Sequence, residues 1–147
     1  MLKLKIYKTK IPSDINIMCA TINEILRYLQ SACEVISEDT LFEVKVILNE
    51  LILNAIKHGN QEMGDRFVKI AAAVTKSGRM FLVIEDEGQG YDYKCIAKNA
   101  VNSLGDEDSC EMKVSGRGLI IVANLSEKLR LNKKGNRIVI LKRLLYE

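Results

Sequence analysis

The sequence lacks the long apolar runs that mark secreted and membrane proteins. Its first ten residues, MLKLKIYKTK, alternate lysine with apolar residues and contain no continuous apolar segment, which excludes an ordinary signal peptide. No stretch approaches the roughly 18 uncharged apolar residues that suggest a transmembrane helix. These absences predict a cytoplasmic protein with no membrane partner.

Metal-binding and redox motifs are also missing. The four cysteines, Cys19, Cys33, Cys95 and Cys110, form no CxxC pair, and no histidine stands near them at metal-ligand spacing. Neither a zinc site nor a dithiol redox centre is supported. Reduced thiols are the expectation for a cytosolic protein.

The sequence has little excess charge of either sign, since the formal net charge is +3. A nucleic-acid footprint needs clustered lysine and arginine with a groove-reading element, so we expect no direct nucleic-acid partner. The 147 residues, 48% of them hydrophobic and 28% charged, suit one globular domain with a real core. Residues 1–147 are therefore predicted to form a single domain.

The N-terminal half reads as a strand followed by two helices. Leu2, Leu4 and Ile6 alternate with polar residues, as in a half-buried strand. Residues 12–14, Pro-Ser-Asp, give a helix-start signal, and apolar residues follow at three- and four-residue steps over positions 15–29. That stripe suits packing on a sheet, because it is too short for a coiled coil.

The second helix begins with a cap and two acids, and it meets a stop signal. Ser37 is the expected cap, Glu38 and Asp39 lie in the first turn, and Gly59 marks the end. In the C-terminal half, residues 66–75 and 80–86 predict a hairpin, residues 116–125 a short helix, and residues 128–143 a strand, turn and strand.

Residues 91–115 show no clear periodicity and include an acidic stretch at 106–108. A segment of this length without a pattern is either disordered or a functional lid.

A polar stripe runs along the last turns of the second helix. Glu50, Asn54 and His58 stand at four-residue steps, which place them on one face of an α-helix. An amide oxygen such as that of Asn54 is a neutral hard ligand suited to Mg²⁺, and Glu50 is placed to act as a general base. Each residue also has an interpretation without a site. Glu50 can be a surface carboxylate, Asn54 a hydrogen-bonded polar residue, and His58 a cation at the C-terminal end of the helix.

Two glycine-rich segments follow the stripe along the chain. Asp86-Glu87-Gly88-Gln89-Gly90 ends a predicted strand, where Asp86 can accept a hydrogen bond from an exocyclic amino group such as that of adenine. Glycines there allow close backbone approach, although the segment can equally be a plain turn. Gly116 and Gly118 open the next helix, whose N-terminal amides favour phosphate.

Together these three pieces resemble the GHKL ATPase superfamily. Glu50-x-x-x-Asn54-Ala55-x-x-His58 is similar to its N-box, DEGQG to its G1 box and GRGL to its G2 box, with a lid between the last two. On a short chain, NAIKHGN with SGRGLIIV is most similar to the bacterial anti-sigma-factor serine kinases. The sequence's one histidine lies within the N-box, which excludes an autophosphorylating histidine kinase.

The resemblance implies a two-layer α/β sandwich, the histidine-kinase-like ATPase fold. It consists of a mixed, mostly antiparallel sheet covered on one face by helices, with ATP and Mg²⁺ bound under a lid at about residues 91–115. Glu50 is then the catalytic base and Asn54 the Mg²⁺ ligand. The other residues implied to contact the nucleotide are His58, Asp86, Gly88, Gly90, Gly116, Arg117, Gly118 and Leu119, although Arg117 can equally face solvent or a partner.

The implied function is an ATP-dependent protein-serine/threonine kinase and anti-sigma factor. Its expected partners are an anti-anti-sigma protein of the STAS type and a sigma factor or other regulator, and the resemblance also allows a homodimer. The alternative is a non-catalytic, nucleotide-responsive binding module of the same fold. The last strand, NRIVILKR, lacks the threonine that family members often place at the adenine site.

Overall fold

The structure is a computed structural model that describes residues 5–33, 35–89 and 114–145, with backbone only for residues 114–116. In chain order its elements are β1 (Tyr7–Pro12), α1 (Ile15–Ala32), α2 (Glu38–Asn54), the π-helical turn η1 (Ala55–Gly59), β2 (Phe67–Val74), β3 (Arg79–Glu85), α4 (Val114–Leu125), β4 (Lys128–Leu131) and β5 (Arg137–Arg143). Among these residues, no helix has both the length and the apolar composition that a membrane span requires.

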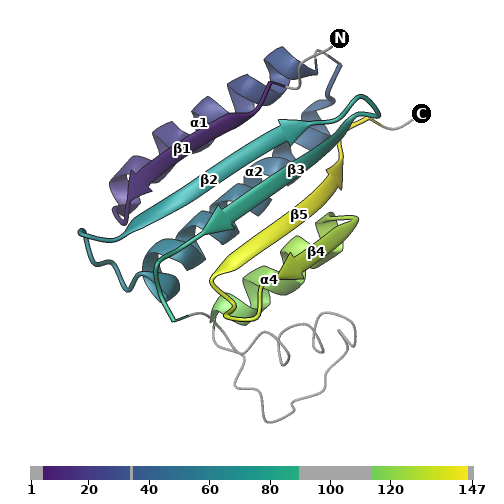
Figure 1. Ribbon diagram of the computed structural model, residues 1–147. Coiled ribbons are helices and arrows are strands. Elements are labelled where there is room, and N and C mark those ends of the chain that lie inside the picture. Colours follow the sequence, from purple (N-terminus) through teal and green to yellow (C-terminus); the bar gives the residue numbers. More distant parts are fainter. Residues whose placement is uncertain (1–4, 34, 90–113, 146–147) are drawn as a thin grey trace.

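The strands form one sheet in the order β1-β2-β3-β5-β4, and all four pairings in the described part of the chain are antiparallel. Helices α1, α2 and α4 lie side by side on one face of this sheet (Figure 1). The predicted two-layer α/β fold is confirmed. The parallel pairing that a mixed sheet would contain is not among the described strands.

The helix starts follow the local signals in the sequence. The Asp14 side chain accepts a hydrogen bond from the backbone amide of Asn16 at 2.9 Å and caps α1. Ser37 accepts from the amide of Thr40 at 3.1 Å and caps α2, whose first turn carries the two predicted acids. Caps of this kind satisfy amides that have no partner within the helix.

The predicted hairpins are confirmed. Of the apolar residues that predict the first strand, Leu2 and Leu4 lie outside the described residues. Gly78 and Gly135 adopt positive φ in the β2–β3 and β4–β5 turns, a conformation that glycine adopts without strain. Strand β1 begins at Tyr7, and Ile6 is 54% exposed, so the prediction that Ile6 lies on a buried strand face is wrong. The position of strand β1 is set by its pairing with β2, in which Ile11 lies opposite Val68.

Helix α2 does not continue as a regular α-helix to Gly59. It ends at Asn54, and the next five residues form the π-helical turn η1, in which the amide of Asn60 donates to the carbonyl of Ala55 at 2.8 Å. Each turn of a π-helix holds more residues than an α-helical turn. Residues after Asn54 therefore leave the stripe that the α-helical spacing predicts.

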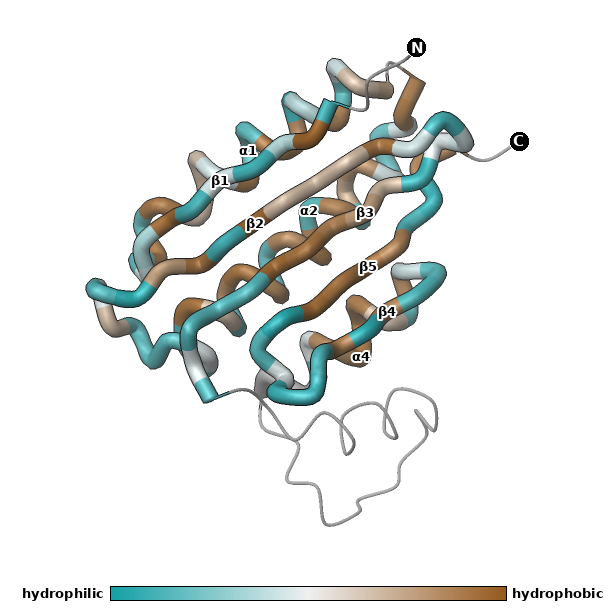
Figure 2. The backbone as a smooth tube through the Cα atoms, viewed as in Figure 1, coloured by the Kyte–Doolittle hydropathy of each residue, from teal (hydrophilic) through white to brown (hydrophobic). Residues whose placement is uncertain are grey.

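The core lies between the sheet and the helices, where apolar residues line the middle of β3 and β5 and the facing sides of the helices (Figure 2). The charged side chain of Lys142 is buried among them. Lys142 on β5 is 1% exposed, and its Nζ donates to Glu43 Oε2 and to the carbonyl of Leu125, both at 2.8 Å. This ammonium joins β5, α2 and the end of α4.

Candidate functional site

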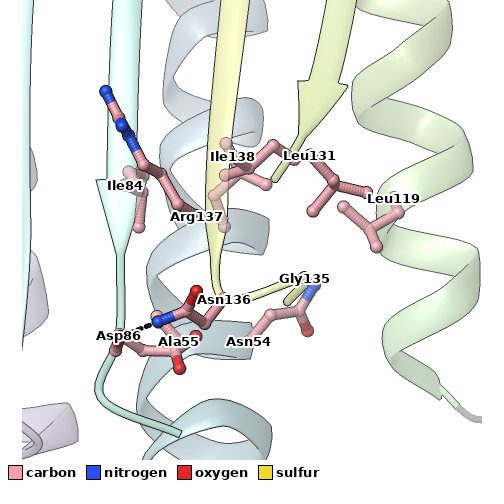
Figure 3. Close-up of a pocket in the computed structure, with 11 residues that line it drawn as sticks. Asn54, Ala55, Ile84, Asp86, Leu119, Leu131, Gly135, Asn136, Arg137 and Ile138 are labelled. Carbon is pink, nitrogen blue, oxygen red and sulfur yellow. Dashed lines mark hydrogen bonds between the residues drawn. The ribbon is translucent and has the colours of Figure 1, made fainter. Parts of the chain in front are cut away.

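A pocket opens at the end of the sheet where β3 ends, β5 begins and α2 passes into η1. Figure 3 shows polar side chains at its base and apolar side chains along its wall. The strands and the β4–β5 turn contribute one side, and α2 and α4 contribute the other. The lining residues are Leu51, Asn54, Ala55, Ile84, Asp86, Leu119, Leu131, Gly135, Asn136, Arg137 and Ile138.

Asp86 is the buried carboxylate of this pocket, with 6% of its surface exposed. It directly follows β3, and its Oδ1 accepts the backbone amide of Gly88 at 2.8 Å. Asn136 holds its main chain on both sides, because the Asn136 side-chain amide donates to the Asp86 carbonyl and the Asp86 amide donates to the Asn136 carbonyl. The carboxylate is thus fixed at the pocket base.

Two glycines leave the space that Asp86 occupies. A Cβ added at Gly59 would lie 2.2 Å from Asp86 Cγ, and a Cβ at Gly88 would lie 1.9 Å from the carbonyl oxygen of Gly59. Real Cβ atoms do not approach other atoms this closely. The sequence pattern indicated Gly88 but treated Gly59 only as a helix stop, whereas both glycines pack against the carboxylate segment.

Burial raises the pKa of Asp86 to about 6, because the carboxylate loses water when it enters the pocket. The hydrogen bond from the Gly88 amide lowers this pKa, the nearby charge of Glu85 raises it, and the charges of Lys134 and Arg66 lower it. Desolvation is the largest of these effects. Asp86 therefore titrates closer to neutral pH than an exposed aspartate.

The raised pKa predicts that Asp86→Asn stabilises the fold at neutral pH. A group whose folded-state pKa lies above its unfolded value of 3.8 contributes stability below about pH 4, and this is lost as the pH rises through about 6. The variant keeps an oxygen for the Gly88 amide but has no charge to desolvate. We expect its unfolding free energy at pH 7 to exceed the parent's by about 2–3 kcal/mol.

Urea denaturation of both proteins from pH 4 to pH 8 measures this difference, which should be close to zero at pH 4 and grow through pH 6. Asp65→Asn, at an exposed position, is the matched control and should show no such growth. If the difference in unfolding free energy between Asp86→Asn and the parent stayed constant with pH, the raised pKa of Asp86 would be contradicted.

Glu50, Asn54 and Gly118 meet where α4 packs on α2. Asn54 is 7% exposed and Glu50 is partly buried. A Cβ added at Gly118 would lie 2.3 Å from Glu50 Oε2 and 3.6 Å from Asn54 Nδ2. The N-box carboxylate and amide, predicted from helical spacing, are therefore brought together with the second glycine segment, which is more than 60 residues away along the chain.

Of the remaining predicted site residues, some line the pocket and others do not. His58 lies on η1 with its side chain exposed, away from the pocket lining, because the π-helical turn removes it from the Glu50–Asn54 stripe. Leu119 is buried and lines the pocket, whereas Arg117 is exposed. Gly90 lies outside the described residues, as does most of the predicted lid at residues 91–115.

Helix α4 begins at Val114 in the described part of the chain, two residues before the pattern predicts. Gly116 therefore lies in the first turn of α4, where amide groups are free of intrahelical bonds. Gly118 lies one residue beyond the first four amides of the helix. Its role is to leave space for the Glu50 carboxylate, which occupies the position that a side chain would fill.

Asn60 is a positioning residue that the sequence pattern did not indicate. It is fully buried, and its side-chain nitrogen donates to Ser13 Oγ at 2.8 Å and to the Phe67 carbonyl at 2.9 Å. Its side-chain oxygen accepts the amide of Glu87 at 2.7 Å. Asn60 thereby ties the segment after β3, which carries Asp86, to the end of η1 and the start of β2.

The chemistry of the pocket fits an adenine nucleotide with Mg²⁺. Apolar walls from Ile84, Leu119 and Ile138 suit a flat aromatic ring, and Asp86 supplies one buried acceptor for its amino group. From β5, Arg137 and Ile138 line the pocket, and this strand contains no threonine. Asn54 and the first turn of α4 would hold the metal and the phosphates.

The pocket is small in this conformation, with a volume of about 30 Å³. That is room for about one water molecule. Two of the lining residues, Leu131 and Gly135, belong to β4 and the β4–β5 turn.

Comparison with known sequences identifies relatives of this chain. Residues 15–142 match the model of the histidine kinase-like ATPase domain. An anti-sigma F factor of Priestia megaterium is 31% identical over 93 residues, which cover 63% of this chain and 60% of that protein. An anti-sigma F factor of Clostridium novyi (strain NT) is 27% identical over 109 residues, which cover 72% of this chain and 73% of that protein.

Comparison with solved structures supports the same fold. The histidine kinase domain from Erythrobacter litoralis EL346 blue-light activated histidine kinase superposes with a TM-score of 0.55 at 16% sequence identity. The match covers 91% of this chain and 62% of that protein. The layered arrangement of sheet and helices is thus shared with that histidine kinase domain at low sequence identity.

Proposed function

Because the chain belongs to the histidine kinase-like ATPase domain family, we propose that it binds ATP with Mg²⁺ and transfers the γ-phosphoryl group to a partner protein. The acceptor is a serine or threonine hydroxyl of an anti-anti-sigma protein of the STAS type. The same chain also binds a sigma factor, so that exchange of partners regulates transcription in the cytoplasm. The anti-sigma F factors among its relatives support this proposal.

One observation carries the catalytic part of the proposal: the Glu50 carboxylate lies against Gly118 of α4 and beside Asn54. A carboxylate next to the metal and phosphate site is placed to accept the proton of an attacking hydroxyl. The hydroxyl oxygen then bonds to the γ-phosphorus as the bond to ADP breaks. Catalysis of this reaction depends mostly on positioning and charge neutralisation.

The experiment is a transfer assay with γ-labelled ATP, Mg²⁺ and a STAS-type anti-anti-sigma protein as acceptor. Glu50→Gln should lower the rate of transfer by about 10²–10⁴-fold, the usual contribution of a general base. Its affinity for ATP, measured by calorimetry, should stay within about threefold of the parent's, because Glu50 acts on the hydroxyl. Glu38→Gln, at an exposed position on the same helix, is the matched control.

Transfer by Glu50→Gln at the parental rate would contradict the general-base role. ATP binding without any transfer by the parent protein would favour the non-catalytic module, in which nucleotide only reshapes a protein-binding surface. The resemblance also allows a homodimer. Light scattering after size-exclusion chromatography measures the molar mass in the same preparation and shows whether it is formed.

A further inference from the structure

The face of the sheet opposite the helices is uncovered in the described part of the chain (Figure 1). Strand periodicity places alternate residues of each strand on that face. On β1 these include Lys8 and Lys10, on β2 Lys69, and on β5 Arg137, all of them exposed. Positive charge is therefore concentrated on one face of a protein whose net charge is only +3.

Four of these cations surround a hollow in the open face. The hollow has a volume of about 480 Å³, and its lining includes Lys8, Lys10, Lys69 and Arg137. Its floor contains the small residue Ala71 and Val83, and Glu85 is its one carboxylate. Glu85 lies opposite Lys69 across the β2–β3 pairing, so three cations remain in excess.

Apolar side chains continue from the hollow along the same face. Phe81 is 44% exposed and lies opposite Leu141 on β5, and Val83 lies opposite Val139. An apolar centre bordered by charge is the usual composition of a protein–protein interface. The open face thus combines a basic hollow with an adjoining apolar strip.

We propose that this open sheet face is a docking surface for an acidic protein segment that carries apolar residues between its carboxylates. Its carboxylates pair with the lysines of the hollow, and its apolar residues cover the strip around Phe81. Charge complementarity of this kind steers association and selects partners.

Two other occupants fit this face less well. A second copy would place the same basic hollow against itself across a two-fold axis, and juxtaposed like charges oppose association. Single-stranded RNA needs exposed aromatic rings on which bases stack. Among the described residues of this face, Phe81 is the one exposed aromatic ring, because the ring of Phe67 is covered by Lys10, whose Nζ lies 4.5 Å from the ring centroid.

The docking surface extends beyond the proposed function and does not depend on phosphoryl transfer. It adjoins the nucleotide pocket at Arg137, which lines both. The two sites can nevertheless be tested separately, because Lys8, Lys10 and Lys69 do not line the nucleotide pocket.

The test measures binding of a fluorescent 20-residue peptide of alternating glutamate and leucine to the full chain by anisotropy. A triple variant, Lys8→Glu, Lys10→Glu and Lys69→Glu, should bind it about tenfold more weakly or worse. Phe81→Thr, which keeps the charge and suits a strand, should weaken binding severalfold. The control, Lys45→Glu, Lys57→Glu and Lys76→Glu, changes the net charge equally at exposed positions off the hollow and should stay within about twofold of the parent.

Equal weakening by both triple variants would overturn the proposal, because binding would then follow net charge alone. Preference for a 20-nucleotide single-stranded RNA over the peptide would assign the face to nucleic acid. A dimer that dissociates only in the hollow variant would assign it to a second copy. Circular dichroism melting of each variant separates these outcomes from loss of the fold, and ATP affinity, measured in parallel, should be unchanged in all of them.

Discussion

Asn54→Ala is expected to lower the affinity for ATP in the presence of Mg²⁺ by about 100-fold or more, since even residues that only orient a metal ligand contribute 10–100-fold. Asn54 is the last residue of α2, is 7% exposed, lines the pocket and lies beside Gly118. No group of three or more His, Cys, Asp and Glu side chains suited to a metal occurs in the part of the chain that the structure describes. In the proposed site, Mg²⁺ would be held by the Asn54 amide oxygen together with nucleotide phosphates and water.

Calorimetric titration with ATP, with and without Mg²⁺, measures this effect. The parent should bind more tightly with Mg²⁺, and Asn54→Ala should show weak binding that Mg²⁺ no longer improves. Asn49→Ala, at an exposed position on the same helix, is the control and should behave as the parent. Magnesium-dependent binding retained by Asn54→Ala would remove Asn54 from the metal site.

Gly88→Ala is expected to have the second large effect, on both stability and nucleotide binding. The new methyl group would lie 1.9 Å from the Gly59 carbonyl oxygen and 3.0 Å from Asp86 Oδ1. The nearer atom belongs to the main chain, so the conflict can be relieved only by moving a backbone segment. We expect the free energy of unfolding to fall by about 2–3 kcal/mol, as for overpacked cores.

The measurement is urea denaturation together with ATP titration, and affinity should be lost because the displaced segment carries Asp86. Gly64→Ala is the matched control, since a Cβ there meets no atom within 4 Å. If Gly88→Ala does not fold, Gly59→Ala tests the same packing against the movable Asp86 side chain, where ATP affinity should fall with a smaller loss of stability. Parental ATP binding by a folded Gly88→Ala protein would contradict the tight packing.

The features of the fold that could be predicted from the sequence are those that depend on residues close together along the chain. The caps at Asp14 and Ser37 and the turns at Gly78 and Gly135 depend on contacts within a few positions. The proximity of Glu50 and Asn54 was predicted for the same reason, because the two residues lie one α-helical turn apart. The third residue of the stripe, His58, was displaced by a π-helical turn that no local pattern indicates.

The residues that sequence did not indicate make contacts over long chain separations. Asn60 reaches Ser13 across 47 positions, Asn136 reaches Asp86 across 50, and Lys142 reaches Glu43 across 99. Asparagine and lysine at such positions look like ordinary polar surface residues until the strands pair. Their burial is decided by tertiary packing, which local propensity does not contain.

The strand order also determines when the protein can finish folding during synthesis. Strand β3 pairs with β5 over residues 79–85 and 137–143, so its second neighbour emerges from the ribosome more than fifty residues after it. Until then one edge of β3 is open, and pairing partners so distant make folding slow and expose apolar strands to aggregation. Because the proposed nucleotide pocket includes Asn136, Arg137 and Ile138, a nascent chain completes this pocket only with this last pairing, and in the proposed function nucleotide would then stabilise a late stage of folding.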